Sequence, residues 1–204
     1  MKKRIVYIVS YFLLLLTLFV CQKPFFMLYN DAAEKGALFS DFFRVMGNGI
    51  SLDATTAGYL TALPFLMVLI SIWVKKFPLR KILLPYYIIA SLLVAVVFVV
   101  DMGLYPFWGF KLDASIFLYL DSPKEAMASV SFGFILLRVV AMLMLTTFYV
   151  WLMCKVTPHQ LEVTAKRIGG TLGMLFLGGI LFIIIRGGVT ESTSNVGQVY
   201  FSNN

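Results

Sequence analysis

Five long apolar runs dominate this sequence, and each is close to the length that a helix needs to cross a membrane. A hydrocarbon core of about 30 Å takes ~17–25 residues as an α-helix, or slightly fewer with interfacial flanks. The core offers no water to backbone amides, so such runs close their hydrogen bonds internally as helices. The sequence therefore predicts an all-α, polytopic membrane protein with five transmembrane helices, at about 5–28, 53–74, 82–103, 123–154 and 168–185, and short interfacial helices on its outer face. The runs are Ile5–Val20, Ala54–Val74, Ile82–Val100, Val130–Cys154 and Ile168–Ile185.

The composition supports a membrane protein independently of where each helix begins. Apolar residues make up 60% of the chain and charged residues 13%, and the mean hydropathy is +0.90. A soluble domain carries about 25% charged residues. The formal net charge is +7, but the basic residues flank the apolar runs and form no basic stripe, so nucleic acid is not an expected partner.

The loops are sorted by the sign of their charges. Ten of the seventeen basic residues lie before the first run, between the second and third, and between the fourth and fifth, whereas nine of the ten acidic residues lie at the other ends of the runs. The positive-inside rule then predicts a cytoplasmic N-terminus and an extracytoplasmic C-terminus. The basic residues are Lys2, Lys3, Arg4, Lys75, Lys76, Arg80, Lys81, Lys155, Lys166 and Arg167, and the acidic exception is Glu162.

The first run could also be a signal peptide, because three basic residues precede it. However, no small-x-small cleavage site follows the run, and Val20 stands where a lipoprotein signal has a small residue before Cys21. We therefore expect an uncleaved anchor. Cys21 and Cys154 then lie at opposite ends of the bundle, which excludes a disulfide between them within one chain.

The outer loop 22–53 has the pattern of a short helix on the membrane surface. Asp31 and Glu34 are spaced like a helix cap and its reciprocal acidic partner, and the apolar residues that follow have helical periodicity. We expect Gly47-Asn48-Gly49 to end this helix and Asp53 to cap the next one. The apolar positions are Ala37, Leu38, Phe39, Phe42, Phe43 and Met46.

The outer segment after the third run combines aromatic residues with helix caps. Asp113 can cap a short helix over 114–120, and Ser122 to Glu125 form a capping box with Pro123 at the first helical position. The fourth membrane helix is therefore expected to start near Pro123, outside the bilayer. An interfacial aromatic cluster is predicted from Tyr105, Phe107, Trp108 and Phe110.

Two patterns inside the membrane helices predict packing. Pro64 should kink the second helix, in a packing rather than a gating role. Gly169 and Gly173 have the small-xxx-small spacing that lets another helix approach closely.

The sequence holds few groups for catalysis, and we expect no catalytic, cofactor-binding or metal-binding residue in it. Its one histidine, His159, lies in a predicted cytoplasmic loop where it should be solvated, and no Cys or His cluster has metal-ligand spacing. Arg138 needs an explanation, because a charge inside a membrane helix is a functional candidate. It either forms a structural ion pair with Asp101, which we favour slightly, or binds a lipid headgroup.

Several short strings are spread over the whole chain: Gln22-Lys-Pro24, Ala57-Gly-Tyr-Leu-Thr-Ala62, Val100-Asp101, Phe107-Trp-Gly-Phe-Lys-Leu-Asp113, Ser122-Pro-Lys-Glu-Ala-Met-Ala-Ser-Val130, Ile185-Arg-Gly-Gly188 and Asn195-Val-Gly-Gln-Val-Tyr-Phe-Ser202. Together they resemble the bacterial lipoteichoic acid synthase family, the sulfatase-like membrane phosphoglycerol transferases. The family has five N-terminal transmembrane helices and then an extracytoplasmic catalytic domain with a threonine nucleophile and a divalent metal, manganese or magnesium. That domain moves glycerol phosphate from phosphatidylglycerol or hydrolyses related esters.

The resemblance implies a division of the chain and a set of partners. Residues 1–186 would be the membrane domain, and residues 187–204 an extracytoplasmic linker towards the catalytic domain. None of the family's nucleophile or metal ligands can be carried onto a residue of this chain, so we expect it to be inactive alone. Its implied partners are anionic phospholipid and the catalytic domain, and its implied location is the bacterial inner (cytoplasmic) membrane.

Two functions are weighed from the sequence. The first is a membrane-anchoring and substrate-presenting module that keeps a catalytic domain beside lipid headgroups. The second is a self-contained small transporter or an accessory membrane subunit, although the sequence has no internal repeat and no paired broken helices. A coding frame that continues past Asn204 for about 350–450 residues, the size that the resemblance implies for an α/β domain, would favour the first.

The predicted orientation can be tested by thiol labelling in intact cells. Cysteines placed at Lys35, Asp113 and Ser194 should react with an impermeant maleimide, because the positive-inside rule places them outside. Cysteines at Lys76 and His159 should react only after permeabilisation, and their labelling in intact cells would reverse the assigned orientation.

Overall fold

The computed structural model describes residues 1–31, 36, 38–109 and 131–187, and this part of the protein is helical. The one pairing of extended residues in it is an antiparallel bridge between Phe77 and Leu161, in two loops. The helices are α1 (Lys2–Tyr29), α2 (Phe39–Asn48), α3 (Ile50–Ile70), α4 (Leu79–Trp108), α7 (Phe132–Val156) and α8 (Arg167–Arg186).

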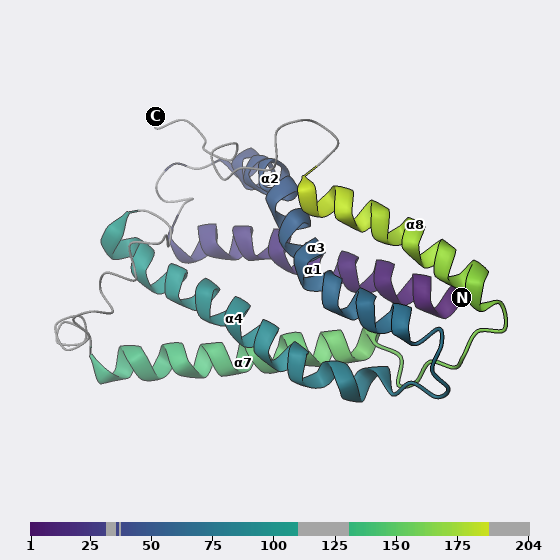
Figure 1. Cartoon of the computed structure of the whole chain (residues 1–204). Helices are drawn as coiled ribbons and strands as arrows, with labels where there is room; N and C mark the ends of the chain where they lie inside the picture. Colours follow the sequence, from purple (N-terminus) through teal and green to yellow (C-terminus); the bar gives the residue numbers. More distant parts are fainter. Residues whose placement is uncertain (32–35, 37, 110–130, 188–204) are drawn as a thin grey trace.

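Five of these helices, α1, α3, α4, α7 and α8, are long and apolar enough to cross a membrane, as the sequence predicts. Successive spans run in alternate directions, so the bundle has two ends (Figure 1). We call one of them the α2 end; α1, α4 and α8 finish there, and α3 and α7 begin there. The other is the basic end, named for the loops that carry Lys75 and Lys166.

The helices associate in two groups. The closest associations are of α3 with α1 and α8, and of α4 with α7. Contacts between the groups are fewer, and they involve α1 with α7 and α4, and α3 with α4. Large apolar side chains such as Leu137 and Phe176 remain exposed on the outside of the bundle, which is the surface that lipid tails would contact.

Two helix boundaries differ from the predicted ones. The third span, α4, continues to Trp108 and ends at Gly109, whose φ of 71° is the left-handed conformation that favours glycine. The fourth span, α7, begins at Phe132 and not near Pro123, because Ser131 is extended and its hydroxyl accepts a hydrogen bond from Phe134 N at 3.3 Å. The predicted caps at Asp113 and Ser122 lie outside the described residues.

The surface helix exists, but different residues cap it. Helix α2 begins after Leu38, whose N–H donates to the Asp41 carboxylate at 2.9 Å. The helix ends at Asn48 before Gly49, as predicted. Helix α3 then begins at Ile50, so Asp53 lies within its first turn and the prediction that it caps this helix is wrong.

Buried tyrosines fill the core of the bundle towards the basic end. The rings of Tyr11 and Tyr87 stack with their centroids 5.6 Å apart. The Thr157 hydroxyl donates to Met153 O at 2.7 Å and lies 2.7 Å from the Tyr87 hydroxyl, which lies 2.7 Å from the Tyr7 hydroxyl. Since the Thr157 proton goes to Met153, Tyr87 donates to Thr157 and Tyr7 donates to Tyr87. This chain joins α1, α4 and α7 without leaving a hydroxyl unsatisfied, which would cost about 1–3 kcal/mol.

Arg4 forms a second polar centre at the basic end. Its side chain is 4% exposed and makes hydrogen bonds to neutral acceptors only. Nε donates to Ser71 Oγ at 3.0 Å, Nη1 to Thr164 Oγ1 at 2.8 Å, and Nη2 to the backbone carbonyls of Ser71 at 2.8 Å and Glu162 at 2.6 Å. One guanidinium therefore ties the start of α1 to the end of α3 and to the loop between α7 and α8.

Two glycines of α8, Gly170 and Gly178, pack against neighbouring side chains, whereas the predicted pair, Gly169 and Gly173, does not. A Cβ at Gly169 or Gly173 would meet nothing within 4 Å, so the close-approach prediction for these two is wrong. A Cβ at Gly178 would lie 2.8 Å from Phe65 Cζ on α3, and one at Gly170 would lie 3.0 Å from Met1 Sδ. Adjacent helical residues point about 100° apart, so the spacing alone did not show which glycines face the bundle.

Substitution of Gly178 should weaken the α3–α8 contact. Gly178→Val places a side chain where Phe65 is already buried, and overpacking of this kind costs about 1–3 kcal/mol. We expect the melting temperature of the purified chain to fall by roughly 3–10 °C. Gly179→Val is the matched control, because a Cβ there meets nothing within 4 Å. Equal losses in both variants would contradict this packing.

Candidate functional site

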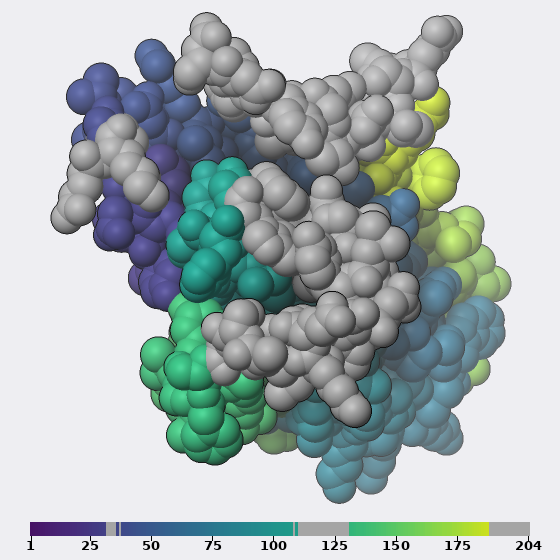
Figure 2. Space-filling view, turned by 90° about the vertical axis from the view of Figure 1, so that its left-hand side faces the viewer, coloured from purple at the N-terminus to yellow at the C-terminus, as the bar shows by residue number. Residues whose placement is uncertain are grey.

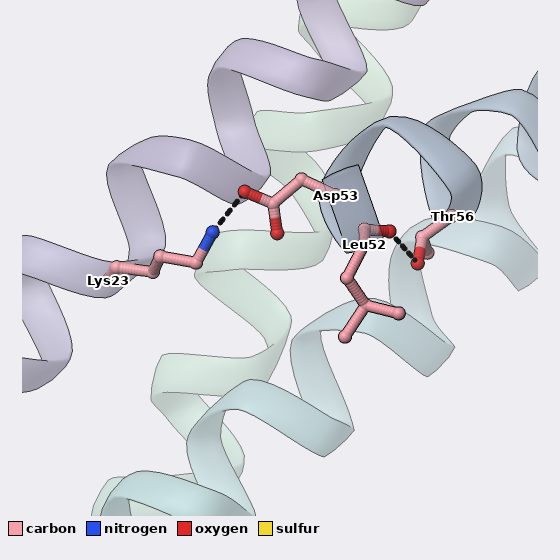
Figure 3. A network of polar contacts seen from close by, with 4 residues as sticks. All are labelled: Lys23, Leu52, Asp53 and Thr56. Atoms are coloured by element: carbon pink, nitrogen blue, oxygen red, sulfur yellow. Dashed lines mark hydrogen bonds and ion pairs between the residues drawn. The ribbon is translucent and has the colours of Figure 1, made fainter. Parts of the chain in front are cut away.

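An ion pair links two membrane helices at the α2 end. Lys23, on the last turns of α1, reaches the Asp53 carboxylate on the first turn of α3 (Figure 3). The two side chains are 15% and 13% exposed, so water screens them only in part. Gly49 makes this approach possible, because a Cβ there would collide with the end of the Lys23 side chain.

A cleft of about 380 Å³ lies beside this ion pair, between α1, α3 and α4. Its volume falls in the range of ~300–1,000 Å³ that is usual for sites holding small ligands. It occupies the region where the group of α1, α3 and α8 meets the group of α4 and α7. The lining residues are Phe19, Gln22, Lys23 and Phe26 from α1, Leu52, Asp53 and Thr56 from α3, and Leu93, Val94, Val97, Phe98 and Asp101 from α4.

The cleft is polar at the α2 end and apolar further into the bundle. On α4, Asp101 is followed inward by Val97 and then Leu93, which share one helical face at a spacing of four residues. At 1.5 Å per residue, this wall extends over about 12 Å. On α1, Phe19 lies one turn inward from Lys23 on the same face. The cleft therefore has a charged end and an apolar end.

Lys23 and Asp101 lie at a similar level on their two helices. The Phe26 ring on α1 meets the Tyr105 ring on α4 edge-on, with a centroid distance of 4.9 Å and an interplanar angle of 76°. Phe26 is three residues beyond Lys23, and Tyr105 is four residues beyond Asp101, on helices that run in the same direction. Both charges are therefore about one turn inward from a direct α1–α4 contact.

Arg138 lies at a different junction, where α1, α4 and α7 meet. Its Nη2 donates to the Tyr29 hydroxyl, and its Cζ lies 5.1 Å from the Tyr29 ring centroid and 4.7 Å from that of Phe134. A Cβ at Gly103 on α4 would lie 3.3 Å from Arg138 Nε. Viewed from the α2 end, the purple-blue end of α1, the teal end of α4 and the green start of α7 lie next to one another (Figure 2). Two aromatic faces and one hydroxyl therefore surround this cation.

The expected ion pair between Asp101 and Arg138 is not found in the described structure. Ion pairs between described side chains are Lys23–Asp53 and Arg44–Asp41. Asp101 lines the cleft, whereas Arg138 packs on Gly103, two residues further along α4. Two residues turn a helix by about 200°, so these positions lie on nearly opposite faces of α4.

The predicted aromatic cluster is distributed along the last turns of α4. Tyr105 packs on α1, Phe107 is 76% exposed, and Trp108 is the final helical residue. Phe110 lies outside the described residues. A membrane-interface location for these residues stays a prediction.

His159 contacts a basic residue at the far end of the bundle. Its Nε2 lies 2.9 Å from Arg80 Nη1, and it must be the acceptor because a guanidinium has only donors. Arg80 also donates to Thr157 O through Nε at 3.1 Å and Nη2 at 2.7 Å. No group of three or more His, Cys, Asp or Glu side chains that could hold a metal gathers in the described part of the chain.

The sequence contained a signal for the Lys23–Asp53 ion pair that the interpretation of single residues missed. Lys23 falls inside the first predicted span, and Asp53 was assigned only as a helix cap. Opposite charges at the same end of two consecutive antiparallel spans are expected to meet, because an isolated charge near hydrocarbon is costly. Considering the two positions together would have predicted the ion pair, although not the cleft.

No protein-family model, curated protein or solved structure matches this chain.

Coupling between Arg138 and Tyr29 can be measured with a double-mutant cycle on thermal stability. Tyr29→Phe removes the hydroxyl acceptor but keeps the ring, so we expect a coupling energy of about 0.5–1.5 kcal/mol with Arg138→Leu. Tyr59→Phe is the control, because Tyr59 is an exposed tyrosine on α3. Additive losses for the Tyr29 and Arg138 variants would show that this contact contributes nothing.

Proposed function

We propose that this chain is the membrane-anchoring and substrate-presenting part of an enzyme that resembles lipoteichoic acid synthase. In this proposal the α2 end faces the outside, and the cleft holds a phospholipid headgroup within reach of a sulfatase-like extracytoplasmic domain. The observation that carries the proposal is the polarity gradient of the cleft, with Lys23, Asp53 and Asp101 at one end and apolar side chains beyond them. An amphipathic ligand with a charged head fits such a gradient.

The position of α8 supports the same function. A Cβ at Gly58 would lie 2.7 Å from Ile185 Cγ1, so the end of α8 packs against the first half of α3. Helix α8 therefore ends, at Arg186, at the α2 end of the bundle. A domain attached there would meet its lipid substrate at a high effective concentration, and the gain in rate would come from proximity. Any nucleophile and any manganese or magnesium ion would belong to that domain.

Transport is the less supported alternative. A transport path has to continue through the bundle, whereas buried Tyr7, Tyr11, Tyr87 and Met153 fill its core towards the basic end. Hydrogen bonds among the hydroxyls of Tyr7, Tyr87 and Thr157 also join α1, α4 and α7 there.

A bulky side chain in the cleft should exclude the lipid. We expect Thr56→Trp to reduce the phospholipid that copurifies with the chain by at least about threefold, as measured by native mass spectrometry, because a large indole would fill much of the site. Thr147→Trp on α7 is the matched control. Both threonines are exposed, and each donates its hydroxyl to the carbonyl four residues earlier, at 2.9 Å for Thr56 and 2.8 Å for Thr147.

Thr147 lies among Leu143, Phe148 and Trp151 on an apolar surface of α7 without charged residues in its lining. Lipid there should be annular and easily exchanged. Equal lipid loss in the two tryptophan variants, or no loss in Thr56→Trp, would contradict the presentation function. Circular dichroism of both variants verifies that the helices are retained.

A further inference from the structure

Arg138 carries a positive charge that the described part of the chain does not neutralise. Neither of the two ion pairs between described side chains includes it. The rings of Tyr29 and Phe134 attract the cation, but an aromatic ring has no net charge. A cation in a membrane helix is costly without a counter-ion, so aromatic packing alone does not account for this arginine.

The guanidinium of Arg138 also has unused hydrogen-bond donors. It carries five N–H groups, and the Tyr29 hydroxyl is the acceptor found for them among the described residues. Its Nε is buried and has no hydrogen-bond partner there. Buried donors are nearly always paired in folded proteins. An unpaired donor on a charged group therefore indicates an acceptor that does not belong to the chain.

The side chain of Arg138 points towards the α2 end of the bundle. Side chains of a helix lean towards its N-terminus, and α7 begins at this end. The contacts agree with this direction, because Phe134 is one turn nearer the start of α7 and Tyr29 is the last residue of α1. The guanidinium therefore lies near the adjoining ends of α1, α4 and α7 (Figure 2), where a leaflet at the α2 end would have its headgroups.

An apolar face of α7 continues inward from Arg138. Ala141, Met142 and Leu145 follow it at spacings of three, four and seven residues, so they share its face of the helix. All three are partly exposed. An acyl chain can lie along them while its headgroup stays at the arginine. A soluble anion would make no use of this face, so the pattern favours a lipid.

We infer that Arg138 binds the phosphate group of a phospholipid at the junction of α1, α4 and α7. Two N–H groups of its guanidinium hold two phosphate oxygens as a fork. The acyl chains extend inward along the apolar face of α7. This site lies on another face of α4 from the cleft, so the inference does not depend on the proposed function.

The surrounding residues hold the guanidinium in place for such a ligand. The Tyr29 hydroxyl accepts from Nη2, and a Cβ at Gly103 would lie 3.3 Å from Nε, so the side chain packs closely on α4. Arg138 nevertheless remains partly exposed. A cation that is already positioned loses little side-chain entropy when an anion binds. Tyr29 is therefore a positioning residue of the site.

The test compares two lipids that differ by the phosphate. The purified full chain is mixed with phosphatidylglycerol or with diacylglycerol of the same acyl chains, and native mass spectrometry measures the lipid retained. We expect phosphatidylglycerol to be retained about tenfold over diacylglycerol, and Arg138→Gln to abolish this difference, because hydrogen bonds to a charged group are lost. Undiminished retention of phosphatidylglycerol by Arg138→Gln would overturn the inference.

Two further variants separate a fork from a general attraction between charges. Arg138→Lys keeps the cation and its aromatic surroundings but cannot form the fork, so we expect retention of phosphatidylglycerol to fall by about threefold. Arg186→Gln is the matched control, because Arg186 is an exposed arginine that ends α8 at the same end of the bundle. It should leave retention unchanged. Full retention by Arg138→Lys, or an equal loss in Arg186→Gln, would contradict recognition of the phosphate by Arg138. Circular dichroism verifies that each variant keeps its helices.

Inorganic phosphate distinguishes a lipid from a soluble phosphate. An excess of it should leave the retention of phosphatidylglycerol unchanged, because it has no acyl chains to lie along α7. If inorganic phosphate displaces the lipid and raises the melting temperature of the unaltered chain but not of Arg138→Gln, the ligand is a soluble phosphate and the lipid assignment is wrong.

The site at Arg138 and the cleft can fail separately. We expect Arg138→Gln to lower phosphatidylglycerol retention by the same factor in the unaltered chain and in the Thr56→Trp variant, since distant sites act additively. If Arg138→Gln has no effect in the Thr56→Trp variant, the lipid lies in the cleft and the inference fails. If Thr56→Trp retains all the lipid but Arg138→Gln loses it, the inference stands and the presentation function of the cleft fails.

Discussion

Polar groups inside a hydrocarbon layer have no water to bind, so each must find its partner within the protein. In this bundle the requirement extends from the backbone to the side chains. Arg4 makes four hydrogen bonds to neutral acceptors, and Tyr7, Tyr87 and Thr157 form a continuous chain of hydroxyls. Because these bonds join different helices, satisfying the polar groups also fixes how the spans are arranged. Apolar packing between the helices alone is much less specific, since lipid tails are as apolar as the side chains.

The two ends of the bundle use their polar residues in different ways. At the basic end, Arg4 and Arg80 donate to backbone carbonyls and hydroxyls and hold the loops against the helices. At the α2 end, the charged residues Lys23, Asp53 and Asp101 line a cleft between α1, α3 and α4. In the proposed function, the basic end anchors the bundle and the cleft at the α2 end presents a ligand.

The cleft at the α2 end combines the charged residues Lys23, Asp53 and Asp101 with an apolar wall on α4. In the proposed function, a phospholipid enters from the leaflet at the α2 end and its chains lie along α4. Arg138 is not part of this cleft. Its guanidinium contacts Tyr29 on α1 and Phe134 on α7, next to another face of α4.

Length and hydropathy were enough to predict five helical spans and the short helix α2, because both depend on local composition and on the bilayer thickness. Helix ends were less predictable, since the extended backbone of Ser131 and the hydrogen bond from Leu38 to Asp41 depend on local geometry. Which faces of the spans meet was decided only by tertiary structure. Asp101 and Gly103 are two residues apart, yet one lines the cleft and the other packs under Arg138. The rotation of each helix about its axis comes from satisfying buried polar groups on several helices at once, and a single sequence does not show that rotation.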